Sequence, residues 1–170
     1  EYRDCIINLL DTPGHQDFSE DTYRVLTAVD SALMVIDAAN GVESQTLRLL
    51  EVCRARNTPI VTFINKMDRE VKPPMELMDE IETALGIEVV PFTWPVGMGK
   101  SFAGVIDIAN MRMRMFKAGE DRVTEDSHAV VDVNDPALKE RLGTDLENAL
   151  AEVELIKEAM PAFDLDAFLA

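Results

Sequence analysis

The sequence predicts an α/β fold with a partial, mostly parallel sheet, helices on both faces of that sheet, a small antiparallel β appendage and C-terminal helices. Apolar runs rich in β-branched residues alternate with segments of helical periodicity, which is typical of strand–helix–strand units. From residue 97 onward, glycines interrupt the chain and apolar residues alternate with polar ones, which indicates antiparallel strands with one solvent-facing side. The predicted regions are residues 1–96, a β-rich lobe over 97–134 and a helical part over 135–170.

The composition is that of a globular, strongly acidic chain. Its 170 residues are 47% hydrophobic and carry a formal net charge of -16. The length suffices for one domain with a core, or for one domain with an appendage. Because nucleic-acid backbones are bound by an excess of Lys and Arg, this segment is not expected to bind nucleic acid directly.

The ends and cysteines of the chain lead to further expectations. No stretch approaches the roughly 20 apolar residues of a membrane span and no leader opens the sequence, so we expect a soluble, cytoplasmic protein. The chain starts without methionine and almost at once becomes a predicted strand, which favours an excised piece of a longer protein. Cys5 and Cys53 have no metal-ligand spacing, and both are expected to be core thiols.

The first half of the chain is predicted to alternate between strands and helices. Ile6–Leu10 is expected to be a buried strand that places Asp11 in a loop at its carboxyl end. The continuous apolar run Ser31–Asp37 is typical of a parallel strand covered on both faces. The predicted strands are Ile6–Leu10, Ser31–Asp37, Ile60–Ile64 and Glu88–Thr93. The predicted helices are Gln16–Val29, Glu43–Arg56 and the segment from Pro73-Pro74 to Gly86. The apolar stripe of the second helix is Leu47, Leu50 and Cys53.

The second half is predicted to form antiparallel strands and then helices. Val105–Phe116 alternates, with three methionines opposite two arginines; core packing is favoured for the methionine stripe over a binding surface. Asn134-Asp135-Pro136 has a cap residue before proline at the first helical position. The other expected features are a turn through Lys117–Asp121, a strand over His128–Val133, a capping box at Thr144–Glu147, a buried helical stripe of Leu146, Leu150, Val153 and Ile156, and a last helix starting at Asp164.

Two polar clusters follow two of the predicted strands. Asp11 is suited to a metal ion or a proton donor, Gly14 lets a backbone N–H approach an anion closely, and His15 supplies a neutral ring that orients water. Asn65-Lys66-Met67-Asp68 follows the Ile60 strand. In open α/β sheets ligands bind at the carboxyl ends of strands, so both clusters are candidate binding sites.

Asp-Thr-Pro-Gly-His at 11–15, followed by Asn-Lys-Met-Asp at 65–68, resembles the GTP-binding core of the translational GTPases. Residues 18–24, 35–43 and 93–100 are similar to the bacterial peptide chain release factor 3 family within that group, and the likeness weakens beyond residue 104. The resemblance implies a P-loop NTPase-like fold, with 1–96 as part of the GTP-binding domain. It also implies that 97–134 is the β-rich part, and 135–170 the helical part, of the extra lobe found in release factor 3 and elongation factor G, which ends here before the GTP-binding domain is expected to resume.

The resemblance further implies GTP or GDP and Mg²⁺ as ligands, with His15 positioning the attacking water as the catalytic residue. Asp11 would reach the metal through water and Gly14 would meet the terminal phosphate. An ionised Asp68 suits guanine, because the ring edge of that base offers two adjacent N–H donors. Asn65 would bond the base, with the stem of Lys66 along its ring face. The implied nucleotide-binding set is Asp11, Thr12, Pro13, Gly14, His15, Asn65, Lys66, Met67 and Asp68.

The implied function is a translation termination factor that hydrolyses GTP and drives release of class-I release factors from the ribosome. No Gly-x-x-x-x-Gly-Lys-[Ser/Thr] phosphate loop occurs, and Gly97–Ser101 only imitates its tail, so the chain alone is expected to bind GTP poorly and to be inactive. Unpaired strand edges are expected to favour self-association. The alternatives left open are an elongation-factor-G-like translocase or ribosomal-protection GTPase, and a non-catalytic interaction domain.

Overall fold

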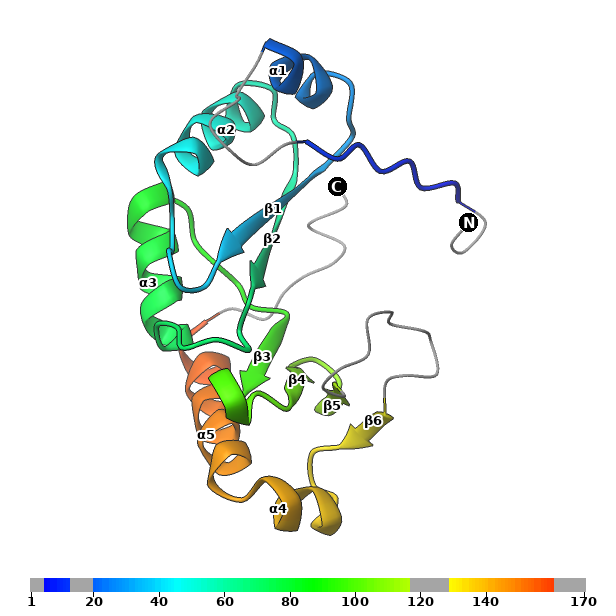
Figure 1. The fold of residues 1–170 in the computed structure, drawn as a ribbon, viewed down its shortest axis with the longest axis vertical. Coiled ribbons are helices and arrows are strands. Elements are labelled where there is room, and N and C mark those ends of the chain that lie inside the picture. Colours follow the sequence, from blue (N-terminus) through cyan, green and yellow to red (C-terminus); the bar gives the residue numbers. More distant parts are fainter. Residues whose placement is uncertain (1–4, 13–19, 117–128, 161–170) are drawn as a thin grey trace. The chain divides into compact units, whose positions relative to one another are not determined.

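The computed structural model describes residues 5–12, 20–116 and 129–160 (Figure 1). These residues pack into two compact units. The first unit comprises residues 1–36 and 42–63, and the second comprises residues 37–41 and 64–170.

The first unit contains a parallel strand–helix–strand arrangement, as the sequence predicts. The sheet pairs β1 (Ala32–Asp37) with β2 (Ile60–Asn65), and α2 (Ser44–Ala55) connects them. Ala32 N–H donates to the Pro59 carbonyl at 2.9 Å, and Ala38 N–H donates to that of Asn65 at 3.0 Å. The two residues of each bond are separated by the same number of positions along the chain, as expected for parallel strands. The arrows in Figure 1 point the same way. Helix α1 (Glu20–Leu26) precedes β1 and ends before the predicted Val29, and the predicted start at Gln16 lies outside the described residues.

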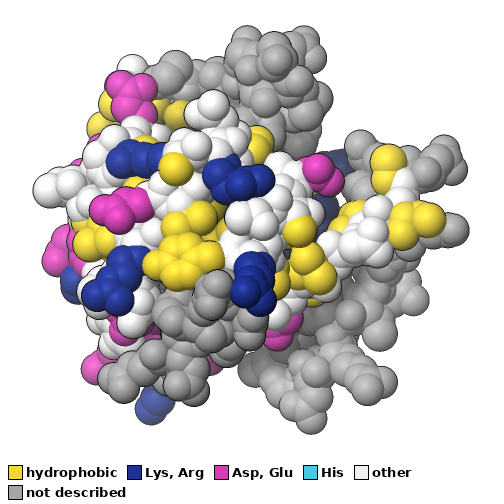
Figure 2. All heavy atoms as spheres, turned by 90° about the horizontal axis from the view of Figure 1, so that it is seen from above, with side chains coloured by type: hydrophobic (Ala, Val, Ile, Leu, Met, Phe, Trp, Pro, Cys, Tyr) yellow, Lys and Arg dark blue, Asp and Glu magenta, His cyan; other side chains and the backbone are white. Residues whose placement is uncertain are grey.

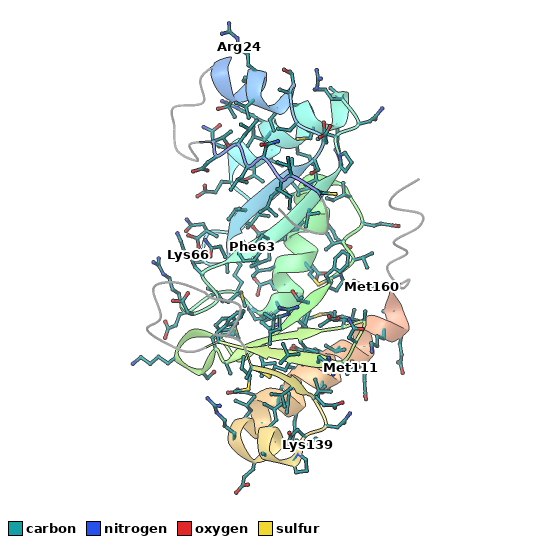
Figure 3. All side chains as sticks on the ribbon, turned by 90° about the vertical axis from the view of Figure 1, so that its right-hand side faces the viewer. Arg24, Phe63, Lys66, Met111, Lys139 and Met160 are labelled. Carbon is teal, nitrogen blue, oxygen red and sulfur yellow. The ribbon has the colours of Figure 1, made fainter. Side chains whose placement is uncertain are left out.

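One side of this two-stranded sheet is solvent-exposed. Leu33 and Val35 of β1, and Val61 and Phe63 of β2, all have exposed side chains. The expectation that the Ser31–Asp37 run is covered on both faces is therefore wrong for the described residues. Figure 3 labels Phe63 on β2, and Figure 2 shows hydrophobic side chains exposed among Lys and Arg on one face of the molecule.

The prediction that Ile6–Leu10 forms a buried strand is also wrong. These residues form neither strand nor helix, and Ile6 and Leu9 are 75% and 82% exposed. An apolar run becomes a sheet strand only when a neighbouring strand takes up its backbone N–H and C=O groups, and the described sheet here consists of β1 and β2 alone. Cys5 is also exposed, so its prediction as a core thiol is wrong, whereas Cys53 is buried in α2 as predicted. On that helix Leu50 is buried but Leu47 is not.

Helix α3 (Pro74–Leu85) of the second unit matches its prediction closely. Pro74 lies at the first turn, and Gly86 ends the helix in the left-handed conformation at φ 59°, where its N–H donates to the Glu82 carbonyl at 2.8 Å. The predicted apolar stripe is fully buried: Leu77, Met78, Ile81 and Leu85.

An antiparallel sheet in the order β3-β4-β5-β6 follows in the second unit. Its strands are Thr93–Val96, Gly104–Asp107, Arg112–Met115 and Ala129–Asp132. The strand predicted over Glu88–Thr93 is wrong in range, since β3 begins at Thr93. It pairs antiparallel with β4, with Trp94 opposite Ile106. The local hairpin supplies this partner, and sequence periodicity does not reveal which partner a short apolar run will take.

The core of the second unit lies between this sheet and the C-terminal helices. Trp94, Ile106 and Met113 pack in one cluster with the buried face of α5 (Thr144–Ala159). Met113 is 0% exposed, while Arg112 and Arg114 face solvent, so the preference for core packing of the methionine stripe is confirmed. Helix α5 contributes Leu146, Ala149, Val153 and Ile156.

The two C-terminal helices begin differently. The Asp135 side chain accepts a hydrogen bond from Ala137 N–H at 2.8 Å and caps α4 (Pro136–Leu142), as predicted. Helix α5 starts after Gly143 without a side-chain cap, so the predicted capping box at Thr144–Glu147 is wrong. The predicted turn at Lys117–Asp121 and the helix from Asp164 lie outside the described residues. Within the described ranges, no helix has the length and hydropathy to cross a membrane.

Candidate functional site

The carboxyl ends of β1 and β2 lie side by side because the strands are parallel. Strand β1 ends at Asp37 and β2 ends at Asn65, the first residue of the predicted Asn-Lys-Met-Asp cluster. Ala38 follows Asp37 directly and is fully buried against Met67 and Leu77. The loop after β2 is therefore fixed to the loop after β1 by both a backbone hydrogen bond and apolar contact.

The Asn65–Asp68 segment is a tight turn. The Asn65 side-chain oxygen accepts a hydrogen bond from Lys66 N–H at 2.9 Å, and the Lys66 carbonyl accepts one from Arg69 N–H at 3.1 Å. Lys66 has φ 66°, a left-handed conformation that few non-glycine residues adopt. Such a backbone is held by its surroundings, and here the buried side chain of Met67 anchors it.

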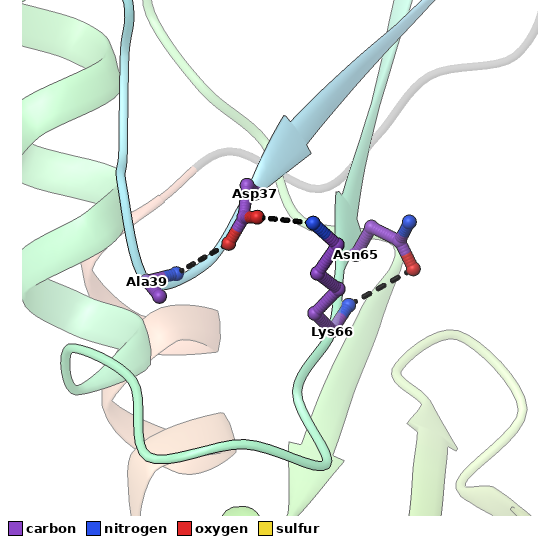
Figure 4. A network of polar contacts seen from close by, with 4 residues as sticks. All are labelled: Asp37, Ala39, Asn65 and Lys66. Carbon is purple, nitrogen blue, oxygen red and sulfur yellow. Dashed lines mark hydrogen bonds and ion pairs between the residues drawn. The ribbon is translucent and has the colours of Figure 1, made fainter.

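The ammonium group of Lys66 contacts a carboxylate on the neighbouring strand. Lys66 Nζ lies 2.5 Å from Asp37 Oδ2, and Asp37 Oδ1 accepts a hydrogen bond from Ala39 N–H at 3.0 Å (Figure 4). The hydrogen bond from Lys66, followed by that from Ala39, lowers the pKa of the Asp37 carboxyl below its ordinary value of 3.8. Asp37 is therefore a negative charge next to the cluster at neutral pH.

Asp37 is not among the site residues that the sequence predicts. The signal was present, because Asp37 ends an apolar strand in the same way as Asp11 ends the Ile6–Leu10 run. Only the pairing of β1 with β2 brings it to Lys66, which lies 29 positions further along the chain.

Asp68 is exposed and lines an open hollow of about 880 Å³. Residues 98–101 also line this hollow, and Gly99 N–H donates to the Met67 carbonyl at 3.0 Å. This segment holds a three-residue 3-10 turn, Gly99–Ser101, and not the long helix that follows a phosphate loop. The hollow leaves the Asp68 carboxylate accessible to a ligand. It is lined by Asp68, Glu70, Val71, Met98, Gly99, Lys100 and Ser101.

The structure covers the other predicted cluster only in part. Asp11 is exposed and Thr12 is half-buried, while Pro13, Gly14 and His15 lie outside the described residues. Asp11 belongs to the first unit and Asp68 to the second. Their convergence on a single nucleotide stays a prediction.

Asp11 is the predicted magnesium ligand and is exposed in the structure. Among the described residues, no group of three or more His, Cys, Asp or Glu side chains could hold a metal ion. Mg²⁺ usually keeps several waters and is bound by one or two carboxylates together with phosphate oxygens of the substrate. A single exposed carboxylate at Asp11 is compatible with that mode of binding.

Comparisons with known proteins agree on one kind of domain. Residues 1–161 match the family described as "Elongation factor Tu GTP binding domain". Proteins named "Peptide chain release factor 3" from Nitrosomonas europaea and Bordetella avium are each 68% identical to this chain, over 100% of it and 32% of their own length. The one from Bordetella pertussis is 67% identical over the same shares. The chain thus spans about a third of the length of these curated relatives.

A solved structure supports the fold. A crystal structure of a protein from Thermus thermophilus aligns with a TM-score of 0.61 and 24% sequence identity, covering 83% of this chain and 20% of that protein. This likeness extends to the fold alone. Together with the family match, it agrees with a P-loop-like α/β fold that carries a parallel and an antiparallel sheet.

Proposed function

The chain belongs to the family of the elongation factor Tu GTP-binding domain, and from that premise we propose that the protein carrying it binds and hydrolyses GTP as a translation termination factor. The observation that carries this proposal is the 68% identity, over the whole chain, to proteins named peptide chain release factor 3. The partners in this function are the ribosome and class-I release factors, whose release the protein promotes. Such a function takes place in the cytoplasm.

The base of the nucleotide is bound by the turn after β2 in this proposal. The exposed Asp68 carboxylate accepts two N–H groups of guanine, whereas adenine presents an acceptor at that edge and leaves the carboxylate unpaired. A polar group that a bound base covers and leaves unpaired discriminates between substrates by orders of magnitude. Asn65 bonds the base and the neighbouring loop, and the Lys66 stem lies along the ring face. The anchoring of this turn by Met67 supports the proposal.

The phosphates are bound by the Asp11–His15 cluster in this proposal. Asp11 is proposed to hold the magnesium ion through water, and Gly14 to place a backbone N–H at the terminal phosphate. Bound magnesium would neutralise charge on the phosphate oxygens. His15 is the proposed catalytic residue, because its ring orients the attacking water. Phosphoryl transfer depends mainly on such positioning and on charge stabilisation, so the ribosome accelerates the reaction by ordering His15.

We propose that the 170-residue chain alone binds GTP weakly and does not turn it over. Phosphate contacts supply much of the affinity of such sites, and the sequence contains no phosphate-loop motif. Calorimetry with GTP and magnesium measures this directly. Binding in the micromolar range or tighter by the isolated chain would contradict the proposal.

Self-association of the isolated chain is part of the same proposal. Leu33, Val35, Val61 and Phe63 expose one apolar side of the β1–β2 sheet, and an exposed apolar patch favours association with other chains. Sedimentation velocity over a range of concentrations is the measurement. A monomer at high concentration would remove this expectation without affecting the proposed GTPase function.

The decisive experiment measures GTP hydrolysis by a full-length protein carrying this chain, on ribosomes with a stop codon in the decoding site. His15→Ala is expected to lower turnover by roughly a hundredfold or more, the usual range for a residue that acts on the proton of a nucleophile, with GTP affinity retained. The chain has two histidines, so His128→Ala is the matched control. Unchanged turnover in His15→Ala removes His15 from the mechanism. Stimulation by translocating rather than terminated ribosomes favours the elongation-factor-G-like alternative.

A further inference from the structure

Asp37 is held in place by the backbone that follows it. Its Oδ1 atom accepts a hydrogen bond from Ala39 N–H at 3.0 Å, and its carbonyl oxygen accepts from the N–H groups of Asn40 and Gly41 at 3.1 and 2.8 Å. This turn closes at the end of β1, and Ala38 within it is completely buried. The carboxylate therefore has a fixed position before any ligand is bound.

The fixed carboxylate contacts Lys66 of the predicted base-binding turn. Asp37 Oδ2 lies 2.5 Å from Lys66 Nζ. The Asp37 side chain is 21% exposed and the Lys66 side chain is 40% exposed. At its other end, Lys66 is held by its left-handed backbone and by the hydrogen bond from its own N–H to Asn65 Oδ1. Figure 4 shows the resulting chain of contacts from Ala39 through Asp37 and Lys66 to Asn65.

We propose that Asp37 is a positioning residue of the guanine site, which holds the Lys66 side chain extended so that its alkyl stem is ready to cover the ring face of the base. This inference rests on the proposed function, because it presumes that Asn65–Asp68 binds a guanine nucleotide. A free lysine side chain loses most of its rotational freedom when it is ordered. Since the Asp37 contact orders Lys66 in advance, less entropy is lost when the nucleotide binds.

The simpler alternative is an exposed ion pair without consequence. Many surface ion pairs contribute nothing measurable, because water screens them and both side chains must be ordered to form them. The Asp37–Lys66 pair differs in that backbone hydrogen bonds already fix the carboxylate, and the strained backbone of Lys66 fixes the start of the other side chain. The loss of freedom on forming this pair is therefore smaller than for two mobile side chains.

The first test measures binding and release of fluorescent GDP by a full-length protein carrying this chain. Asp37→Asn keeps an oxygen for Ala39 N–H but removes the charge that holds Lys66. We expect GDP to bind roughly three- to tenfold more weakly because it is released faster. This is the range for losing one partly exposed charge-assisted hydrogen bond. Asp107→Asn is the matched control, because Asp107 also ends a strand and accepts from Asn110 N–H at 3.0 Å, with no lysine partner among the described residues. The GDP affinity of that variant is expected to stay within about twofold of the affinity of the parent protein, because surface substitutions usually have small effects.

A double-mutant cycle separates positioning from a general structural role. Lys66→Met keeps most of the alkyl stem and removes the ammonium group. If Asp37 acts through Lys66, Asp37→Asn has almost no further effect on GDP release in the Lys66→Met background. If the two effects add, the proposal is overturned. Asp37→Glu, which keeps the charge on a longer stem, is expected to recover part of the lost affinity.

The outcomes distinguish the inference from the function on which it rests. If the parent protein binds no guanine nucleotide, the proposed function fails and the role of Asp37 fails with it. If the parent protein binds GDP but Asp37→Asn releases it at the same rate as Asp107→Asn, only the positioning role is wrong. If Asp37→Asn lowers the unfolding temperature and GDP affinity equally in both Lys66 backgrounds, Asp37 is a structural residue and the proposal is overturned.

Discussion

Trp94 Nε1 donates a 2.7 Å hydrogen bond to Glu152 Oε2 and so joins β3 to α5 across 58 positions of sequence. Trp94 is 2% exposed, and a buried indole N–H is stable only when it has an acceptor. The carboxylate is on the helix that also supplies much of the apolar core around the indole ring. This contact therefore couples the antiparallel sheet to the C-terminal helix.

We expect Glu152→Ala to lower the free energy of unfolding of the second unit by about 1–3 kcal/mol, because the variant leaves the Trp94 N–H buried without a partner. The chain has one tryptophan, so fluorescence during urea unfolding reports on this unit alone. Glu154→Ala is the control, since Glu154 is on the same helix and exposed. Equal destabilisation by the two variants would remove the hydrogen bond as a source of stability.

Met113→Ala is expected to destabilise the same unit by about 2–5 kcal/mol, because Met113 is fully buried and its truncation leaves a cavity next to Trp94 and Ile106. Arg114→Ala, one position along the strand on the solvent side, should change stability by less than about 0.5 kcal/mol. The same urea titration compares the two variants. A near-neutral Met113→Ala would instead favour a binding role for the methionine stripe.

Gly104→Ala is expected to disrupt the pairing of β4 with β5. Gly104 has φ 152°, and a Cβ atom there would lie 2.0 Å from the Arg114 carbonyl oxygen of the neighbouring strand. A backbone atom within a sheet cannot move away as a side chain can, so we expect a loss of about 3 kcal/mol or more. Gly143→Ala is the control because Gly143 also has positive φ but no atom within 4 Å of the added carbon. Amide hydrogen exchange of β4 and β5 measures the difference, and similar exchange in both variants would contradict the clash.

Asp68→Asn is expected to shift base preference from guanine toward xanthine in a full-length protein carrying this chain. An amide replaces one acceptor oxygen by an N–H donor, which matches the carbonyl that xanthine has in place of the guanine amino group. Competition of GDP and xanthosine diphosphate for one fluorescent nucleotide measures the preference. Asp79→Asn, at an exposed position on α3, is the control. An unchanged preference in Asp68→Asn would remove Asp68 from base recognition.

The two cysteines are expected to react at very different rates with a thiol reagent. Cys5 is exposed, while burial in α2 raises the pKa of the Cys53 thiol above its ordinary value of 9.0. Because burial disfavours the thiolate, the contribution of Cys53 to stability is fully present below about pH 9 and is lost as the pH rises through its raised folded-state pKa. At neutral pH one thiol should react quickly and the second only on unfolding. Cys53→Ser identifies the slow thiol, and rapid modification of both thiols in the folded chain would contradict this assignment.

Several elements were predictable from sequence because their causes are local. The stripe of α3 with its glycine cap, the Asp135 cap of α4 and the alternation around Met113 depend on neighbours within a few positions. The strands β1 and β2 were also predicted, since their apolar runs are long and the helix between them is clear. In the same way, the placement of Asn65 at a strand end followed from the sequence pattern alone.

The remaining features depend on pairing with other segments of the chain. Ile6–Leu10 has the composition of a strand but no strand beside it among the described residues. The partner of β3 is the nearby β4, but the apolar run before β3 does not indicate that partner. A strand is completed by hydrogen bonds to another segment, so its own residues do not decide whether it forms or which direction it pairs in.

The sequence by itself determined the candidate turn Asn65–Asp68, the family to which the chain is similar, and helices α3 and α4 with their caps, because motifs and periodicity depend on consecutive residues. Only the tertiary structure decided that Asp37 meets Lys66 and that Met67 anchors the turn. Those contacts exist because two parallel strands end side by side, and a sheet brings together residues that the chain keeps apart.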